Sequence, residues 1–375
     1  MIGRLQEIVE VIIMHIFING YWETNLGDDL FLYIISKKFP KVQFDIYTTR
    51  KNFSVFKGIS NVNLINKRDS LIDRVINKVS VKVNYPLKGS EYDKLIQIAK
   101  GYPVYLELGG SIFMLPSNGS LNVDYLVRII IAKRVKHYLV IGSNFGPYSS
   151  RKQLIKYQHF FKSIESISFR DEYSYNLFKN CGDVNYFPDI VFNLPVQNNY
   201  KAGYVLFSVI NTKRFGSYVD KMYTQFVCNQ VKKEISRGNE VVLMSFCNHE
   251  GDKKKAREIK DRLIGVSKNI RIVEHSNIYK SLKIISGSKK IFATRYHSMI
   301  LGWVFKKPTF VVSYSKKTEN VIKSFFPQQS YAKLTNINEN KNIKYTLIDD
   351  RTLIALKDEA NKHFSDFEKV IQTYE

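Results

Sequence analysis

Short hydrophobic runs alternate along the chain with longer segments in which hydrophobic and polar residues recur every three or four positions. The short runs have the length of buried strands, and the longer segments have the period of helices that cover a sheet. The predicted strands are residues 11–18, 43–47, 104–108, 138–141 and 166–169 in the first half, and 204–209, 240–245, 270–273, 289–294 and 306–317 in the second. This alternation indicates mainly parallel sheets flanked by helices.

The periodicity breaks between residues 187 and 199, where two prolines and a Gln-Asn-Asn run occur. Such clusters are typical of loops. We therefore predict two similar α/β domains, residues 1–195 and 196–350, followed by a helical tail, residues 351–375, that crosses back onto the first domain. A chain of 375 residues with 44% hydrophobic residues is long enough for two cores.

The net charge of the chain indicates that its partners are anions. Lys and Arg total 57 against 34 Asp and Glu, a net charge of +23. This excess raises the local concentration of anions such as nucleic acid, anionic lipid headgroups and phosphorylated metabolites. The basic residues are scattered and form no recognisable nucleic-acid-binding motif, so we do not expect nucleic acid as a partner.

The cysteines and the early apolar run indicate a cytoplasmic protein. Cys181, Cys228 and Cys247 are far apart, so they encode neither a zinc site nor a disulfide framework, and we expect buried thiols. The apolar run at residues 8–18 is too short to span a bilayer and lacks a cleavage site. Attachment to the inner face of a membrane would come from clustered lysines, at roughly 1 kcal/mol per basic residue.

The strongest chemical signal is Arg295-Tyr296-His297, directly after a predicted strand and before a predicted helix. That junction lies on the ligand-binding edge of an open α/β sheet. The next strand delivers Tyr314 and Lys317 to the same edge. A lone histidine at a helix start is usually satisfied by backbone, but the nearby arginine favours an anion site with a proton donor.

Charged residues also follow two other predicted strands, and each of them has two possible roles. Asp28, after Asn25 and Gly27, either caps the following helix, worth about 1 kcal/mol, or orients and deprotonates a hydroxyl group. Arg170 either pairs with a neighbouring acid, Asp171 or Glu172, on the surface or offers its planar fork to an anion.

Glycines also follow strands, in Gly109-Gly110-Ser111 and at Gly142. They either bring backbone N–H groups close to a ligand or simply make turns, and neither loop has the spacing of a phosphate loop. The other histidines, including His275 and His363, have no comparable neighbours in the sequence. The lysine runs at 232–233 and 253–255 are typical of solvated helix faces.

Several catalytic motifs are absent. The sequence contains no Asp-x-Asp, no His-Glu-x-x-His and no Gly-x-Ser-x-Gly. We therefore expect chemistry that needs neither a metal nor a cofactor.

Taken in order, these sequence motifs resemble those of the polysaccharide pyruvyl transferase family. The resemblance covers roughly residues 19 to 325 and rests on Asn25-Leu26-Gly27-Asp28, Gly109-Gly110, Gly142 with Gly146-Pro147, Arg170-Asp171 with Ser174, Pro188-Asp189, Arg295-Tyr296-His297 with Pro308, and Ser313-Tyr314 with Lys317. Two departures exist: the usual three glycines are Leu108-Gly109-Gly110, and the Asp-Pro that often follows the late tyrosine is Ser315-Lys316.

The resemblance implies two Rossmann-like βαβ domains facing a cleft, as in GT-B glycosyltransferases, with the acceptor on the first domain and the donor on the second. It also implies phosphoenolpyruvate as donor and a sugar of a cell-surface polysaccharide precursor as acceptor. The residues expected to bind the donor are Arg170, Arg295, Tyr296, His297 and Lys317; those expected at the acceptor or in its loops are Asn25, Gly27, Asp28, Gly109, Gly110, Ser111, Gly142 and Tyr314.

The expected chemistry is protonation of the donor methylene, attack by two sugar hydroxyls and loss of phosphate, giving a pyruvate ketal. His297 is the expected general acid, and Asp28 would orient and deprotonate the acceptor hydroxyl. Arg170, Arg295 and Lys317 would stabilise the negative charge of the donor. Two alternatives stay open: a GT-B glycosyltransferase that uses a nucleotide sugar, and a non-catalytic binder of an anionic polymer. The acceptor sugar, its linkage, the ketal stereochemistry, any lipid link and the oligomeric state are not encoded in these patterns.

Overall fold

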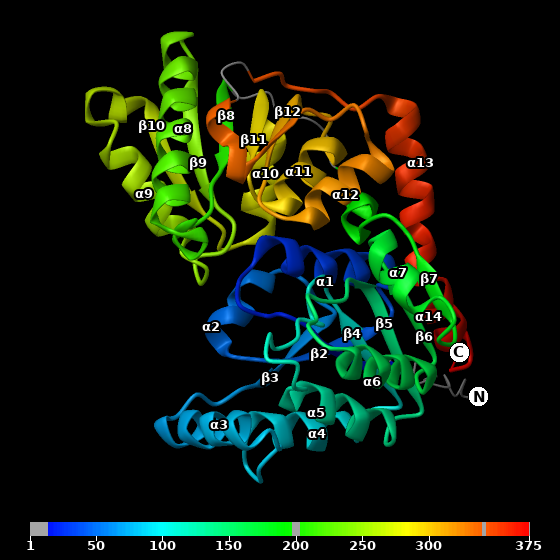
Figure 1. Ribbon diagram of the computed structural model, residues 1–375. Helices are drawn as coiled ribbons and strands as arrows, with labels where there is room; N and C mark the ends of the chain where they lie inside the picture. Colours follow the sequence, from blue (N-terminus) through cyan, green and yellow to red (C-terminus); the bar gives the residue numbers. More distant parts are fainter. Residues whose placement is uncertain (1–13, 197–202, 340–342, 375) are drawn as a thin grey trace, which may run out of the picture.

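The computed structural model describes residues 14–196, 203–339 and 343–374, which form two parallel sheets with helices on both faces (Figure 1). The first sheet has seven strands in the order β3-β2-β1-β4-β5-β6-β7, and the second has six in the order β10-β9-β8-β11-β12-β13. Each order reverses direction beside its first strand, which is typical of Rossmann-like domains. The predicted fold class, two Rossmann-like βαβ domains, is confirmed.

The strands of the first sheet are β1 (His15–Asn19), β2 (Gln43–Thr48), β3 (Val62–Asn66), β4 (Val104–Leu108), β5 (His137–Ser143), β6 (Ser166–Phe169) and β7 (Val184–Tyr186). Those of the second are β8 (Tyr204–Ser208), β9 (Glu240–Ser245), β10 (Ile270–Glu274), β11 (Lys290–Ala293), β12 (Thr309–Ser313) and β13 (Tyr331–Lys333).

The helices of the first half are α1 (Leu26–Lys38), α2 (Arg50–Phe53), α3 (Leu71–Val83), α4 (Glu91–Ala99), α5 (Val123–Ala132), α6 (Arg151–Lys162), α7 (Glu172–Phe178) and the short 3₁₀ helix η2 (Ile190–Asn193). Those that follow are α8 (Ser217–Ser236), α9 (Asp252–Asp261), α10 (Ile278–Gly287), α11 (Tyr296–Val304), α12 (Lys316–Phe325), α13 (Asp350–Asn361) and α14 (Ser365–Gln372). Among the described residues no helix is long and apolar enough to cross a membrane.

The central strands match the sequence prediction, and three of the four edge strands do not. β4, β6 and β9 have the predicted bounds, whereas β3, β7 and β13 were not predicted. These three lie at sheet edges and are only partly buried, so they carry no continuous apolar run for the pattern to reveal. Of the predicted first strand, residues 11–13 lie outside the described residues.

The two sheets share one hydrophobic core. A single cluster of buried side chains runs from the first sheet through α1 and η2 to α10 and α11 beneath the second. Phe192 of η2 stacks on Trp303 of α11, with ring centroids 6.3 Å apart. The halves are therefore joined by apolar burial, the main stabilising force of a core.

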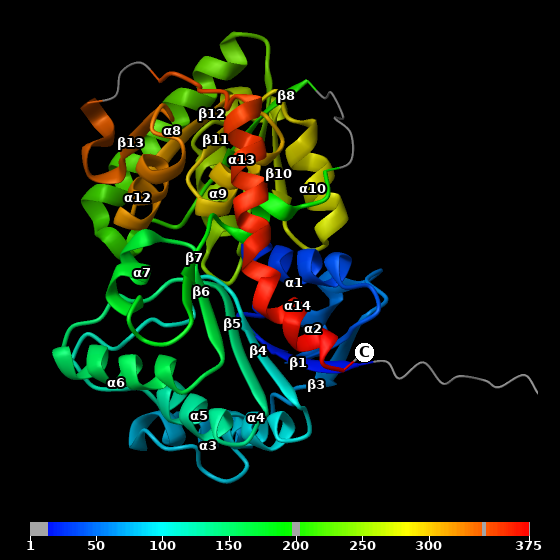
Figure 2. The ribbon, with the colours of Figure 1, turned by 90° about the vertical axis from the view of Figure 1, so that its right-hand side faces the viewer.

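The chain end lies against both sheets (Figure 2). α13 contacts η2, and Phe367 of α14 meets Phe39 edge-on at 5.0 Å between ring centroids. His363, between these helices, is buried; its Nε2 donates to the Pro188 carbonyl oxygen at 2.8 Å, and its Nδ1 lies 2.7 Å from Ser168 Oγ. The domain limits at residues 195 and 350 stay a prediction, and residues 197–199 of the predicted break lie outside the described residues.

Polar contacts also tie α1 to the second domain. Asp29 Oδ2 lies 2.9 Å from His275 Nε2, and His275 Nδ1 lies 2.8 Å from Ser281 Oγ; all three side chains are buried. Burial raises the pKa of Asp29, and the hydrogen bond from His275 opposes this. The Leu26 N–H donates to the Phe246 carbonyl oxygen at 3.1 Å. Sequence reasoning missed His275 because its acidic partner is 246 residues away.

Replacing His275 with alanine is expected to lower the free energy of unfolding by about 3 kcal/mol, because Asp29 would lose its buried partner. Thermal denaturation of H275A against the wild type measures this loss. The control is H249A, in which an exposed histidine of the same domain is removed and no shift is expected. An H275A melting temperature equal to that of H249A would show that the pair contributes no stability.

Candidate active site

The candidate site lies where the carboxyl ends of the two sheets meet. Loops after β4, β5 and β6 of the first sheet supply Gly110, Asn144 and Arg170, and the first turn of α1, which follows β1, supplies Asp28. The first turn of α11, which follows β11, supplies His297. Carboxyl ends of parallel strands share one edge, which is where open α/β sheets bind ligands. Figure 1 shows α1, α7, α11 and α12 between the two sheets.

Arg170 and His297 form the contact between the two edges. Arg170 Nη1 lies 3.0 Å from His297 Nε2 and 2.8 Å from Asp189 Oδ2, and the arginine side chain is only 2% exposed. Asp189 Oδ2 is also 3.6 Å from His297 Nε2. Surface pairing of Arg170 is therefore ruled out: Asp171 caps α7 instead, accepting from the Ser174 N–H at 2.9 Å.

The Arg170 contact defines the protonation of His297. A guanidinium N–H can only donate, so Nε2 accepts and the imidazole proton of the neutral ring is on Nδ1. Burial lowers the pKa of His297; Asp189 opposes this shift and Arg170 adds to it. His297 is therefore neutral near pH 7 in this structure, and its role as general acid stays a prediction.

Two glycines make room for these side chains. A Cβ atom on Gly27 would lie 1.7 Å from His297 Nδ1, and one on Gly110 would lie 1.7 Å from Arg170 Nη2. No side chain fits at either position. The groups that approach these two glycines closely are the His297 imidazole and the Arg170 guanidinium.

Lys317 and Asn144 extend the group toward the first domain. Lys317 Nζ lies 3.3 Å from Asn144 Oδ1 and 3.2 Å from Ser111 Oγ, and it sits 4.6 Å from the centroid of the Tyr296 ring. Asn144 Oδ1 also accepts from Arg170 Nη2 at 3.0 Å. Burial, with Arg170 adding to it, lowers the pKa of Lys317 to about 7. Two cations share one amide oxygen here.

Unpaired donors also occur in this group. Among the described residues, the buried Arg170 Nε and Tyr296 hydroxyl have no hydrogen-bond partner. A buried donor without a partner costs about 1–3 kcal/mol, so both groups would gain from an acceptor. An anion bound beside them would supply the missing acceptors.

Asp28 joins the same group from α1. The helix cap is Asn25, whose Oδ1 accepts from the Gly27 N–H at 3.3 Å, so the interpretation of Asp28 as the cap is wrong. Asp28 is buried in the first turn. Burial raises its pKa, and His297, Arg170 and Lys317 oppose the shift. A carboxyl group with a raised pKa beside three cationic or proton-bearing side chains is suited to accept a proton.

Arg295 lies apart from Arg170. Its Nε and Nη2 atoms bond to Asp252 at 2.8 and 2.5 Å, and Nη1 bonds to Glu250 at 2.8 Å. Tyr314 lies on the same side, with its ring 5.5 Å from Arg214 Cζ. The guanidinium of Arg295 is thus already neutralised by two carboxylates, and its predicted contact with a donor stays a prediction.

The contacts of Gly142, Gly109 and Lys255 are explained by the packing of the chain itself. Gly142 has a φ of 72°, and a Cβ there would lie 2.2 Å from Ile190 Cδ1, so this glycine accommodates η2. Gly109 has a φ of 147° and follows β4 directly. The prediction of a solvated face is wrong for Lys255, which is buried 2.8 Å from Asp220 Oδ1.

Sequence reasoning did not assign roles to Asn144, Asp189 and Asp252. The available signal for Asp189 was its place after Pro188, at the start of a predicted loop. Within the described ranges no three His, Cys, Asp or Glu side chains gather as metal ligands would.

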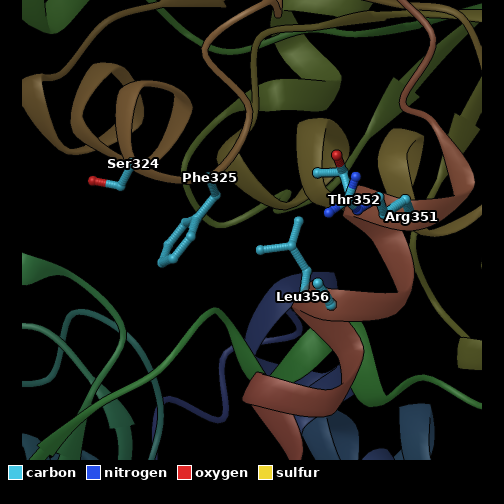
Figure 3. Close-up of a pocket in the computed structure, with 6 residues that line it drawn as sticks. Ser324, Phe325, Arg351, Thr352 and Leu356 are labelled. Carbon is cyan, nitrogen blue, oxygen red and sulfur yellow. The ribbon is translucent and has the colours of Figure 1, made fainter.

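A cavity of about 420 Å³ lies elsewhere, between the end of α12 and the start of α13 (Figure 3). Ser324, Phe325, Arg351, Thr352, Ala355 and Leu356 line it. None of the residues discussed above contributes to its wall. The cavity has one charged side chain and no proton-exchanging pair, so it lacks the chemistry of the site around Arg170.

A sequence model of the polysaccharide pyruvyl transferase family matches residues 25–316, most of the chain. The chain belongs to this family. The match begins at Asn25, includes Arg170 and His297, and ends one residue before Lys317. A search of curated proteins found no match. Family membership identifies the protein as an enzyme of polysaccharide modification, a transferase of pyruvyl groups.

Solved structures share the fold. A putative UDP-N-acetylglucosamine 2-epimerase from Listeria monocytogenes is 12% identical, with 95% of this chain and 97% of that chain covered and a TM-score of 0.53. S. aureus MnaA with UDP is 12% identical, with 93% and 92% covered and a TM-score of 0.55. Anabaena Alr3699/HepE with UDP is 10% identical, with 96% and 100% covered and a TM-score of 0.54. At such identities the likeness extends to the two-domain GT-B fold alone.

Replacing Gly27 with alanine is expected to lower kcat for pyruvyl transfer about 100-fold, because the added methyl group displaces His297 and a shift of about 1 Å has that cost. The control is Gly265→Ala, where a Cβ atom meets nothing within 4 Å. Steady-state kinetics of both variants, with circular dichroism to verify folding, make the measurement. Normal turnover by a folded G27A variant would contradict the assigned position of His297.

Proposed function

We propose that this family member transfers pyruvate from phosphoenolpyruvate to two hydroxyl groups of one sugar in a cell-surface polysaccharide precursor, forming a ketal and releasing phosphate. The observation that carries the proposal is the group of Arg170, Lys317 and His297, in which the buried Arg170 Nε has no hydrogen-bond partner and Lys317 Nζ bonds to the neutral oxygens of Ser111 and Asn144. A small dianionic or trianionic ligand would complete it.

Phosphoenolpyruvate has the charge distribution that this group requires. Its carboxylate and its phosphate are both attached to C2, and arginine and lysine hold such groups by a planar fork and a point charge respectively. Arg170 offers its unpaired Nε, and Lys317 offers an ammonium group whose present partners, Ser111 and Asn144, are neutral. We propose these two side chains as the donor anchors.

Arg295 requires a different account. Its Nε, Nη1 and Nη2 atoms already bond to Asp252 and Glu250, so its charge is balanced before any donor binds. As the residue that caps α11, with its backbone N–H on Ser208 Oγ at 3.1 Å, it also positions the start of the helix that carries His297. We propose this positioning as its role in the absence of donor.

In the proposed reaction a proton adds to the methylene carbon of phosphoenolpyruvate, and C2 becomes electrophilic. One sugar hydroxyl attacks C2, and the bond from C2 to the phosphate oxygen breaks. A second hydroxyl then forms the second C2–O bond. Of the two hydroxyl protons, one is balanced by the new methyl group and the other leaves as hydrogen phosphate, so no oxidant or reductant is required.

His297 and Asp28 are the proposed proton carriers. His297 is neutral in this structure, but an anion beside it would raise its pKa and supply the charged acid. Asp28 would take the proton of the attacking hydroxyl, because its raised pKa brings it toward the range of a useful base. Asp28 follows Gly27 in the first domain, and the His297 ring of the second domain lies against Gly27.

The test is release of phosphate from phosphoenolpyruvate with a panel of acceptor glycosides, followed by mass analysis of the sugar. Release that requires acceptor, with a pyruvate ketal on the product, is expected. H297A should reduce the rate about 100-fold or more, since it removes a proton-transfer group, whereas H249A should not change it. Acceptor-independent release or an unmodified sugar would overturn the proposal.

The same assay distinguishes the two alternatives. A nucleotide-sugar glycosyltransferase would release a nucleoside diphosphate and no phosphate from phosphoenolpyruvate. A binder of anionic polymer would turn over neither donor, and its binding would weaken steeply with salt and not depend on His297.

Lys317 predicts a pH dependence. Its ammonium group is charged below a pKa of about 7 in the free enzyme and loses its proton above it, so donor affinity should fall as pH rises. We expect kcat/KM for phosphoenolpyruvate to fall by up to about tenfold for each pH unit above neutrality. K317R, whose guanidinium stays charged, should flatten this profile, and K316R at the exposed neighbouring position should not. Equal profiles for the wild type and K317R would contradict the role of Lys317.

A further inference from the structure

Helix α3 turns its polar side toward the protein. Three side chains of this helix hold it to the segment that follows: Asp73 Oδ1 accepts from Lys94 Nζ at 2.6 Å, Asn77 Oδ1 from the Glu91 N–H at 2.7 Å, and the buried Ser80 Oγ from the Leu87 N–H at 3.3 Å. A surface helix of a globular domain normally has the opposite orientation, with apolar residues inward. The anchoring of α3 is thus polar.

The apolar side of α3 is left in solvent. Leu71 is 78% exposed, Ile72 73%, Val75 60% and Val79 41%. Ile72, Val75, Val79 and Val83 follow one another at intervals of three and four residues, so they form one stripe along the helix. A stripe of large side chains that faces water has no structural explanation within the chain, and such patches mark interaction surfaces.

Basic residues border this stripe. From residue 67 to residue 88 the sequence contains six basic side chains and two acidic ones. Lys78 and Lys82 lie on the helix beside the stripe and are exposed, with no ion pair among those described for them. The two acids are engaged, since Asp69 pairs with Arg74 at 2.7 Å and Asp73 with Lys94. The surface therefore combines exposed apolar groups with unneutralised positive charge.

We propose that α3 binds the protein to an anionic phospholipid membrane, lying in the plane of the interface with Ile72, Val75 and Val79 among the lipid chains. Helices that bind this way have one apolar face and lysines or arginines on its borders. Each basic residue near an anionic leaflet adds about 1 kcal/mol. The charge excess alone predicted attachment from the sequence; the structure assigns it to one helix.

A second copy of the chain is a poorer occupant. Symmetric pairing of two α3 helices would bring Lys78 and Lys82 of one copy toward those of the other, with no acid on the stripe to pair with them. Anionic headgroups complement the same lysines.

The position of α3 suits attachment without blocking the site. α3 lies on the outer side of the first domain, beside α4 and on the far side from the second sheet (Figures 1 and 2). The residues around Arg170 lie between the two sheets. Membrane binding is therefore independent of the proposed donor chemistry, and the two can fail separately.

The experiment is co-flotation with vesicles of equal parts phosphatidylglycerol and phosphatidylcholine, and with vesicles of phosphatidylcholine alone. The wild type should bind the anionic vesicles and lose binding as salt rises. The double variant I72E/V79E should bind at least about tenfold more weakly, because it places two carboxylates in the lipid-facing stripe. I264E/I354E is the matched control, since it makes the same change at positions 80% and 59% exposed elsewhere, and should bind as the wild type does.

Retained pyruvyl transfer to a soluble acceptor verifies that I72E/V79E is folded. A Val75→Cys variant carrying an environment-sensitive fluorophore reports insertion, because the three native cysteines are buried; its fluorescence should rise only with anionic vesicles. Lack of wild-type binding, or equal binding by I72E/V79E, would overturn the proposal. A wild-type dimer in light scattering that I72E/V79E converts to monomer would assign α3 to a second copy instead.

Discussion

The buried ion pair of Arg170 with Asp189 is the interaction on which the site depends. A guanidinium withdrawn from water is stable only with a charged partner and good hydrogen bonds, and Asp189 supplies both at 2.8 Å. The pair joins the end of β6 to the start of η2 and holds Arg170 against His297 of the other domain. The small residues at positions 27 and 110 follow from it, because imidazole and guanidinium occupy the space above them.

The fold was predictable from local patterns, and the site only in part. Buried central strands such as β4 and β9 show themselves as apolar runs, whereas edge strands and the buried Lys255 depend on contacts that no local pattern records. The sequence singled out Arg170, His297 and Lys317. It did not reveal that Arg170 meets a carboxylate 19 residues away and an imidazole 127 residues away, since such separations are set by packing.

The partners of Arg295 could not be predicted from the sequence for the same reason, because they are set by packing. Its spacing from His297 indicated a common ligand, but two residues that flank a helix start point in different directions. Glu250, in the loop before α9, and Asp252, the first residue of α9, bind the Arg295 guanidinium instead. The site therefore has two parts: one around Arg295, whose donors are paired with carboxylates, and one around Lys317 and Arg170, in which Arg170 Nε is unpaired and Lys317 has neutral partners. Only the second has capacity for an anion, and Asn144 bridges its two cations.

The placement of α1 has a consequence for how such enzymes diversify. This helix follows the first strand of one domain, yet its buried side belongs equally to the other through Asp29, His275 and the shared core. Chimeras that join the first half of this chain to the second half of a relative would therefore mismatch along α1. Exchange of loops around an intact α1 would avoid this mismatch.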